Sequence, residues 1–345
     1  MTLKQMQAQL REILMDKILL NPGPTNTSEE VKDSQHRWSD VCHRTDEFVE
    51  LLIDTKEKIL KRFSSKANSE DWNVSIIAGS GTTAMDALIS SLLDNALIIV
   101  AGKYGTRAKE MSETYNVRHQ VLYCDTIEDL RRNTDLEKIY FVENETTTGE
   151  KFDPALMSKI FPNARLYLDA TSSFGAARYD KILDKIDAIS FCSNKCLQST
   201  PGLGLVIWRK KLTVYNRSYF TNLGKYRISG DLPFTLPTQA LGALNVALDS
   251  EDNLDSFNAR RDRLIQDFKS INIECINLNP SNSIIGFVHP NRSYTSLKYF
   301  LESRGIVIYS GIPEVKNSFR VSTMSTKFDK EYKNILEAFS DSCLC

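Results

Sequence analysis

The sequence has no surplus of charge of either sign, since 43 lysines and arginines stand against 44 aspartates and glutamates in 345 residues. Without a basic surplus, the chain has no overall field that would attract nucleic acid or an anionic membrane. It also has no apolar run that approaches the roughly 20 residues of a membrane span. The first seventeen residues, MTLKQMQAQLREILMDK, lack the continuous apolar stretch of a signal peptide. We therefore expect a cytoplasmic protein that binds neither nucleic acid nor a membrane.

Cysteine and histidine are too scattered to indicate disulfides or a metal centre. The seven cysteines form no C-x-x-C pair, and the four histidines have no ligand spacing. Cys192 and Cys196 could in principle bind a metal, but no second pair of cysteines or histidines stands nearby. We expect reduced intracellular thiols and no metal.

Short apolar segments alternate with segments of helical periodicity over the first two thirds of the chain. The expected strands are NVSIIAG, ALIIVAG, HQVLYC, KIYFVEN, ARLYLDA, DAISFCS and GLGLVIW. Between the first two, TTAMDALISSLL places its apolar residues on one helical face. This alternation favours an α/β fold with a mainly parallel, seven-stranded sheet flanked by helices. Because the last two strands follow each other closely, we expect some antiparallel pairing there.

The pattern changes after about residue 235. A long helical stretch over 238–270 precedes short strands near 271–278 and 283–289, a helix near 294–304 and the strand segment GIVIYSG. We interpret this part as a smaller C-terminal α+β domain. The expected organisation is an N-terminal helical arm (1–17), a large domain (18–250) and a small domain (251–345).

The segment IIAGSGTTAMDAL predicts a strand, a glycine turn and a helix, with Ser80, Gly81 and Thr82 at the helix start. Unpaired amides and the positive end of the helix dipole favour an anion there. The segment also matches the G-x-G-x-x-A pattern of dinucleotide-binding folds. However, the next strand, ALIIVAGKYG, ends without the acidic residue that would hold a ribose. An anion site and a simple helix cap both remain open for this segment.

Two further candidate residues follow apolar strands. Asp169 ends ARLYLDA, where a parallel sheet faces its ligand crevice, and Lys195 lies just past DAISFCS. Taken singly, Asp169 could cap a turn and Lys195 could lie in a surface loop. Together with a phosphate site they match what pyridoxal 5'-phosphate (PLP) requires. The lysine forms a Schiff base as a nucleophilic amine, the aspartate keeps the pyridine nitrogen protonated, and the helix start takes the phosphate.

These residues lie in stretches that resemble class V aminotransferases of the PLP fold type I group, and most of all the 2-aminoethylphosphonate–pyruvate transaminases. The resemblance covers roughly residues 18–325. It is carried, in the family's order, by LLNPGPTNTSEEV, DVCHRTDEF, GSGTTAMDA, GKYGTRAKEM, ENETTTGEKFDP, DATSSFGA, SNKCLQSTPGLGLVI, FTLPTQAL and FRVSTMS. It implies a PLP-dependent transferase fold and an exchange of the amino group between 2-aminoethylphosphonate and pyruvate in phosphonate metabolism.

The resemblance also implies roles for the matching positions. Lys195 would bond the cofactor, and Asp169 would pair with its pyridine nitrogen. The other cofactor contacts would be Ser80, Gly81 and Thr82 at the phosphate, Tyr104 stacked on the ring, and Thr148 and Ser193. Thr235 would reach the phosphate of the neighbouring subunit, which implies a homodimer, and Arg320 would bind the acidic end of the substrate.

Departures from the family pattern leave the identity of the substrate undecided. FTLPT replaces the usual TPPT, FRVSTMS differs from the usual glycine-containing run after the arginine, and the C-terminal domain is short. An alanine– or serine–glyoxylate transaminase of the same class is therefore the alternative. A cysteine desulfurase fits less well, because that group typically has histidines where Tyr104 and Asn194 stand. The missing ribose acid argues against a third class, a nucleotide- or NAD-binding module.

Overall fold

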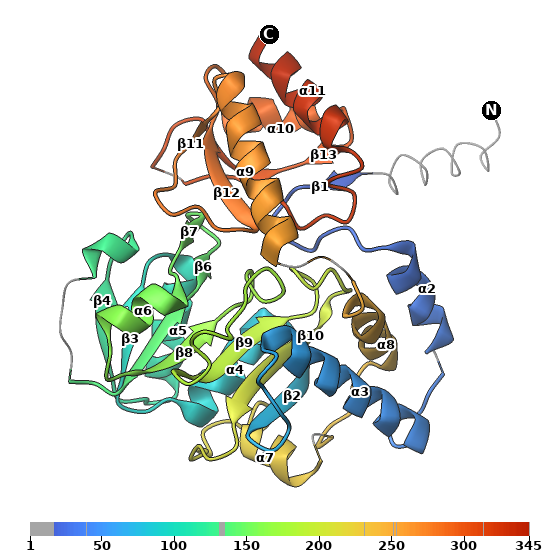
Figure 1. Cartoon of the computed structure of the whole chain (residues 1–345), viewed down its shortest axis with the longest axis vertical. Helices are drawn as coiled ribbons and strands as arrows, with labels where there is room; N and C mark the ends of the chain where they lie inside the picture. The colour runs from blue at the N-terminus through green and yellow to red at the C-terminus, as the bar shows by residue number, and fades with distance from the viewer. Residues whose placement is uncertain are drawn as a thin grey trace.

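The computed structural model describes residues 17–38, 40–130, 135–230, 232–250, 252, 254–312 and 314–344. Within these limits the chain forms a large body and a smaller one above it (Figure 1). The expected N-terminal arm lies outside the described residues, except for Lys17.

The large body is built on a seven-stranded sheet. Its strands lie in the order β2 (Trp72–Gly79), β10 (Gly202–Arg209), β9 (Ile186–Cys192), β8 (Arg165–Asp169), β5 (Lys138–Val142), β3 (Ala96–Val100) and β4 (His119–Tyr123). β10 runs antiparallel to both of its neighbours, and the other neighbouring pairs are parallel. The predicted mainly parallel sheet, with antiparallel pairing between its last two strands, is confirmed.

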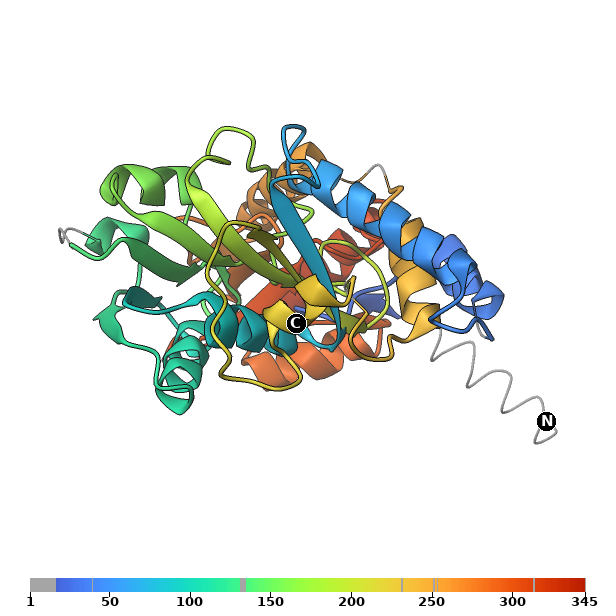
Figure 2. The same cartoon turned by 90° about the horizontal axis from the view of Figure 1, so that it is seen from below.

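Helices bury the two faces of this sheet in separate apolar clusters. One face is covered by α4 (Gly81–Leu92), α5 (Lys103–Thr114) and α7 (Leu223–Ile228). The other is covered by α3 (Asp46–Phe63), α6 (Pro154–Ile160) and α8 (Thr238–Ala247), with α2 (Glu29–Arg37) packed on α8. Seen from below, α3 and the α4–α5 pair lie on opposite sides of the strands (Figure 2). Apolar residues on both faces explain why these strands are nearly continuous hydrophobic runs.

The small body has a four-stranded antiparallel sheet and three helices. Its strands lie in the order β11 (Glu274–Cys275), β12 (Ile284–Val288), β15 (Ser318–Ser322) and β14 (Tyr309–Ser310), beside α9 (Leu254–Ser270), α10 (Tyr294–Glu302) and α11 (Tyr332–Leu344). β1 (Ile18–Leu19) pairs in parallel with β13 (Ile306–Val307), and Ile18 and Leu20 join the core of this body. The chain from residue 18, expected in the large domain, therefore begins in the small one, because its apolar side chains fill that core.

The helical stretch expected over 238–270 is two helices rather than one, and this prediction was wrong. α8 ends at Ala247 and α9 begins at Leu254. Between them the Arg62 guanidinium donates hydrogen bonds to the carbonyl oxygens of Leu248, Ser250 and Asp252. In a continuous helix these carbonyl oxygens would accept from backbone amides one turn later. Here they accept from the guanidinium instead, and the helix is interrupted.

Among the residues in the described part of the chain, no helix combines the length and the apolar character needed to cross a lipid bilayer. No three histidine, cysteine, aspartate or glutamate side chains among these residues gather in a way that could hold a metal ion. The cysteines that the structure describes are free thiols.

Candidate active site

The carboxyl ends of the parallel strands meet at one edge of the large sheet, and most of the predicted site residues follow these ends. Ser80, Gly81 and Thr82 come after β2, Tyr104 after β3, Thr148 after β5, Asp169 ends β8, and Ser193 and Lys195 come after β9. Because parallel strands bring their carboxyl ends to the same edge, residues far apart in the sequence come together there.

The start of α4 approaches the turn after β8 closely because residue 81 is glycine. A Cβ atom on Gly81 would lie 2.8 Å from the side chain of Thr171. Ser80 and Thr82 on either side are exposed, and the Ser80 backbone N–H donates to Thr83 Oγ1 at 3.1 Å. The helix start therefore combines exposed hydroxyl groups with a close approach to the Asp169 turn.

Arg107, which the sequence reasoning missed, joins the helix start to Tyr104. Its Nη1 donates to Thr82 Oγ1 at 2.9 Å, and its guanidinium lies 4.9 Å from the centre of the Tyr104 ring. Burial raises the pKa of the Tyr104 hydroxyl, while the charge of Arg107 opposes this rise. The available signal for Arg107 was its position in GKYGTRAKEM, where it is a cation one helical turn after the predicted ring-stacking residue.

Asp169 is a buried carboxylate that is short of a cation. It is 1% exposed, and its Oδ1 accepts from Thr171 N at 2.9 Å and Thr171 Oγ1 at 2.6 Å. No described residue donates a hydrogen bond to Oδ2, and none forms an ion pair with this side chain. Burial raises the pKa of Asp169 to about 6, against the lowering effect of the Thr171 hydrogen bonds. An added cationic group beside Oδ2 would stabilise the charged form.

Lys195 lies in a confined setting without an acidic partner. Its ammonium donates to the carbonyl oxygen of Pro22, and a Cβ on Gly23 would lie 2.7 Å from Nζ. No described carboxylate forms an ion pair with it. Burial lowers the pKa of Lys195, the charge of Arg320 lowers it further, and the charge of Asp169 opposes this. The lysine is therefore easier to deprotonate than one in water.

Arg320 brings a buried guanidinium from the small body. It is 5% exposed on β15, where Nε donates to Ser310 O at 2.5 Å and Nη1 donates to Thr146 O. The guanidinium also lies 5.1 Å from the centre of the Tyr309 ring. Burial lowers its pKa, and no acid in the described part of the chain pairs with it. A buried guanidinium without a carboxylate is suited to bind an external anion.

Glu145 is a second site residue that was not predicted. This fully buried carboxylate ends β6 (Asn144–Glu145) and accepts from Thr147 Oγ1 at 2.6 Å and from Gly105 N at 3.3 Å. It forms no ion pair within the described chain. Its negative charge acts on Asp169 and Arg320, which places all three in one electrostatic cluster. Its position in the quoted stretch ENETTTG was the only signal.

The remaining three predicted residues have other surroundings. Ser193 is buried, and its hydroxyl donates to Thr200 O at 2.6 Å. Thr148 lies in the turn between β6 and β7 (Glu150–Lys151), where its hydroxyl donates to Glu145 O at 3.3 Å. Thr235 is exposed in the loop before α8. The hydroxyl groups of Ser193 and Thr148 therefore hold local backbone, and that of Thr235 faces outward.

Comparisons with known proteins fit this arrangement. No family model matches the chain. The curated 2-aminoethylphosphonate–pyruvate transaminase of Bacteroides fragilis is 26% identical over 94% of this chain and 98% of its own length. The transaminase of the same name from Syntrophobacter fumaroxidans is 28% identical over 94% of this chain and 96% of its own length. The predicted resemblance to these transaminases is confirmed.

Solved structures show the same fold. An aspartate aminotransferase of subgroup IV from Thermus thermophilus superposes with a TM-score of 0.84 at 23% identity, over 94% of this chain and 98% of that one. The alanine–glyoxylate aminotransferase of Nostoc sp. has a TM-score of 0.80 at 21% identity, over 95% of both chains. The PLP-bound phosphoserine aminotransferase of Trichomonas vaginalis has a TM-score of 0.77 at 16% identity, over 94% and 99%. The predicted aminotransferase fold is confirmed.

Proposed function

We propose that this protein is a PLP-dependent transaminase of phosphonate metabolism. It exchanges the amino group of 2-aminoethylphosphonate with the oxo group of pyruvate, and the products are phosphonoacetaldehyde and alanine; the reaction can run in either direction. The observation that carries the proposal is the placement of Lys195 and Asp169 at the ends of the neighbouring strands β9 and β8. One is a lysine and the other a buried carboxylate, and neither forms an ion pair within the described chain.

The side chains at this edge have the donors and acceptors that PLP needs. The free Oδ2 of Asp169 suits a protonated pyridine nitrogen, and the start of α4 suits a phosphate. In this proposal Ser80, Gly81 and Thr82 hold the phosphate, and Tyr104 lies on the ring. Ser193 and Thr148 support the contact residues through their backbone hydrogen bonds. When bound, PLP is linked to the lysine amine and spreads the negative charge that forms when the substrate loses a proton.

Lys195 moves the proton in this proposal. Because burial lowers its pKa, the uncharged amine is more accessible near neutral pH than it is for an exposed lysine. The uncharged Nζ takes the proton from the carbon that bears the amino group of the substrate, and returns a proton when the second substrate is converted. Asp169 keeps its negative charge against the cofactor throughout.

Arg320 binds the anionic end of both substrates. Ser310 and Thr146 hold Nε and Nη1 in place, and no described residue accepts a hydrogen bond from Nη2. A planar guanidinium can donate two hydrogen bonds to a phosphonate or to a carboxylate. The curated relatives favour the phosphonate. The alanine–glyoxylate aminotransferase among the structural neighbours supports a second candidate, an alanine– or serine–glyoxylate transaminase.

We infer further that the working unit is a homodimer with shared active sites in the cytoplasm. Thr235 is exposed, and in this proposal it reaches the cofactor phosphate of a second copy. Tyr219 and Phe220 are exposed beside Phe234, the residue before Thr235, and this aromatic surface is suited to burial by that copy. The free thiols of the described cysteines agree with a reducing compartment.

The visible absorbance of the purified, PLP-loaded protein tests the reaction and the substrate together. We expect the band of the lysine-bound cofactor to fade on addition of 2-aminoethylphosphonate and to return with pyruvate. Lys195→Ala is the control and should show neither change. Fading only with alanine or serine would support the second candidate. The absence of any band after incubation with PLP would refute the cofactor assignment.

A further inference from the structure

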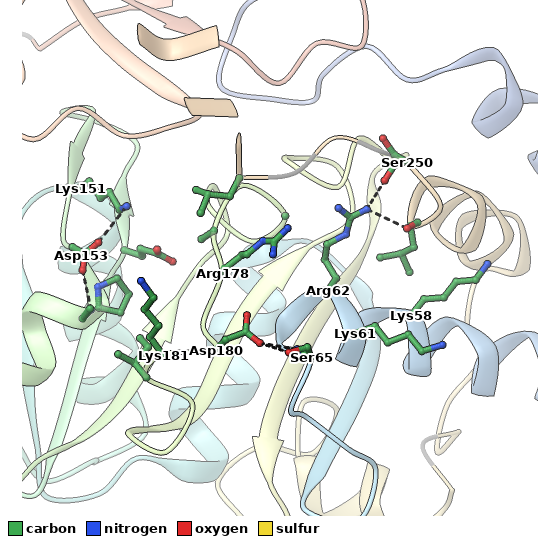
Figure 3. A pocket seen from close by; sticks show the side chains of 18 of the residues that line it. Lys58, Lys61, Arg62, Ser65, Lys151, Asp153, Arg178, Asp180, Lys181 and Ser250 are labelled. Atoms are coloured by element: carbon green, nitrogen blue, oxygen red, sulfur yellow. Dashed lines mark hydrogen bonds and ion pairs between the residues drawn. The ribbon is translucent and has the colours of Figure 1, made fainter. Parts of the chain in front are cut away.

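A cavity of about 1110 Å³ lies between the large body and the segment that leads into the small one (Figure 3). Its walls come from α3, the start of α6, the segment 175–182 and the connection 248–254. None of the predicted site residues lines it. Its volume is slightly above the usual range of about 300–1,000 Å³ for small-molecule sites in proteins.

The cavity has an excess of positive charge. Six of its lining residues are cationic, namely Lys58, Lys61, Arg62, Lys151, Arg178 and Lys181, and four are acidic. All four acidic side chains already have partners: Asp249 with Lys58, Asp153 with Lys151, Asp180 with Ser64 and Ser65, and Glu143 with Ser173 and Tyr179. The wall therefore has two more cationic than acidic side chains, and none of its acids forms an ion pair with Arg178 or Lys181.

Arg62 and Arg178 form the centre of this unbalanced charge. In Figure 3, Arg178 extends toward Arg62, and Lys181 lies on the other side of Arg178, toward Asp153. Burial lowers the pKa of Arg62, the negative charges of Asp252 and Asp249 oppose this, and the positive charge of Arg178 adds to it. Arg62 bonds only to backbone carbonyl oxygens, and Arg178 and Lys181 have no ion pair within the described chain. Like charges that face one cavity repel each other, and an anion bound between them would offset this repulsion.

We propose that this cavity is a second binding site, for a multiply charged phosphorylated small molecule held by Arg62, Arg178 and Lys181. The Arg178 guanidinium can donate paired hydrogen bonds to phosphate oxygens, and Lys181 adds a point charge. Arg62 has two N–H groups left, on Nε and Nη1, because its other three bond to carbonyl oxygens. The cavity is large enough for a phosphate group carried on an organic body as well as for an inorganic polyphosphate. The site does not depend on the chemistry proposed at Lys195.

A ligand here would lie against the connection between α8 and α9, which leads from the large body into the small one. Arg178 belongs to the large body, and Arg62 holds the connection between α8 and α9 through its carbonyl groups. Gly175 also lines the cavity, and a Cβ placed on it would lie 3.1 Å from the carbonyl oxygen of Cys196. The wall of the cavity thus touches the loop that carries Lys195.

Titration calorimetry on the PLP-loaded protein tests the site, with pyrophosphate and ATP as probes at fixed ionic strength. Loading with PLP keeps the start of α4 occupied. Arg178→Gln and Lys181→Gln are exposed substitutions that leave Arg62 and its backbone contacts in place. Lys211→Gln removes an exposed lysine outside the cavity, and Arg320→Gln disables the other anion site.

We expect each cavity substitution to weaken binding by about tenfold, as the loss of one charge-assisted hydrogen bond implies. Lys211→Gln and Arg320→Gln should bind as the unsubstituted protein does. Tighter binding of ATP than of pyrophosphate would identify a nucleotide-like ligand, and equal binding a site that reads the phosphates alone. No binding to the unsubstituted protein, equal weakening by Lys211→Gln, or loss only in Arg320→Gln would overturn the proposal.

Discussion

Burial shifts the pKa values of Lys195 and Asp169 in opposite directions. Burial lowers the pKa of the lysine and raises that of the aspartate to about 6, so each shift favours the neutral form. Neither shift is cancelled by an ion pair within the described chain. A cationic ring beside Asp169 would reverse the effect on the carboxylate, which makes the two side chains more stable with a cofactor than without one.

Asp169→Asn should stabilise the cofactor-free protein in a pH-dependent way. The pKa of Asp169 is raised from 3.8 to about 6, so the folded protein holds a proton between these values that the unfolded chain releases. Wild-type stability therefore rises as the pH falls through this window. At pH 8 the substitution should raise the free energy of unfolding by up to about 3 kcal/mol, and the gain should vanish near pH 4. Urea unfolding at both pH values measures this.

Asp169→Asn should weaken the binding of PLP, although it stabilises the cofactor-free protein. Asparagine cannot pair as an anion with a protonated pyridine nitrogen, so the affinity for PLP should fall. Equal stabilities of the two proteins at pH 8 would show that Asp169 does not carry a charge that costs energy in the cofactor-free state.

Arg320→Lys should show how much of the binding of the substrate's anionic end depends on positive charge and how much on the planar geometry of the guanidinium. A lysine keeps the positive charge but cannot donate two parallel hydrogen bonds, nor can it bond to both Ser310 O and Thr146 O as the guanidinium does. We expect kcat/KM for 2-aminoethylphosphonate to fall by about 10² or more, mainly through KM. Steady-state kinetics with each substrate measures it, and an unchanged KM would exclude Arg320 from substrate binding.

The residues that the sequence could single out are those whose place in a strand pattern is easy to see, and the roles proposed for them stay predictions. Lys195 and Asp169 could be found because a parallel sheet gathers its carboxyl ends. Arg107 and Glu145 act through contacts with Thr82 and Gly105 that only the folded chain displays. Hydroxyl residues were the least predictable group, because a serine or threonine can equally well satisfy its own backbone.

At the scale of elements, strands were more predictable than the ends of helices. Each buried strand is a continuous apolar run, so periodicity identified it. The break between α8 and α9 has no proline or glycine, and depends on the distant Arg62. Likewise, β1 joins the small body because β13 offers it an edge, which no local pattern indicates.

The start of α4 makes a prediction of its own. Thr83 Oγ1 accepts the backbone N–H of Ser80 and so caps the helix that carries the proposed phosphate site. Thr83→Val should lower the free energy of unfolding by about 1 kcal/mol. Thr114→Val is the matched control, because the Thr114 hydroxyl donates to Glu110 O in the last turn of another helix, α5. This substitution should change the free energy of unfolding by less than about 0.5 kcal/mol. Equal losses in urea unfolding would argue against a capping role.

For the whole molecule, Asp252 joins the two bodies. It accepts from Gln198, three residues after Lys195, at 2.9 Å and from the buried Arg260 of α9 at 2.8 Å. Arg260 also pairs with Asp329 at 2.6 Å. Removing Arg260 leaves both Asp252 and Asp329 without the cation that they pair with.

Arg260→Met should therefore cost about 2 kcal/mol of unfolding free energy. Lys333→Met breaks a pair with Glu337 in which both side chains are exposed, and should change stability by less than about 0.5 kcal/mol. Chemical denaturation followed by separate probes of the two bodies would also show whether they unfold together. A loss confined to the small body would mean that Asp252 does not couple them.

The pairing of β1 with β13 sets an order of events during synthesis of the chain. Residues 18–19 leave the ribosome early, but their partners, residues 306–307, follow about 290 residues later. Pro22 and Gly23, which enclose Lys195, travel with the early segment. The surroundings of the lysine are thus completed only after residues 306–307 have emerged, so a nascent chain can form the core of the large sheet while its lysine is still open to water.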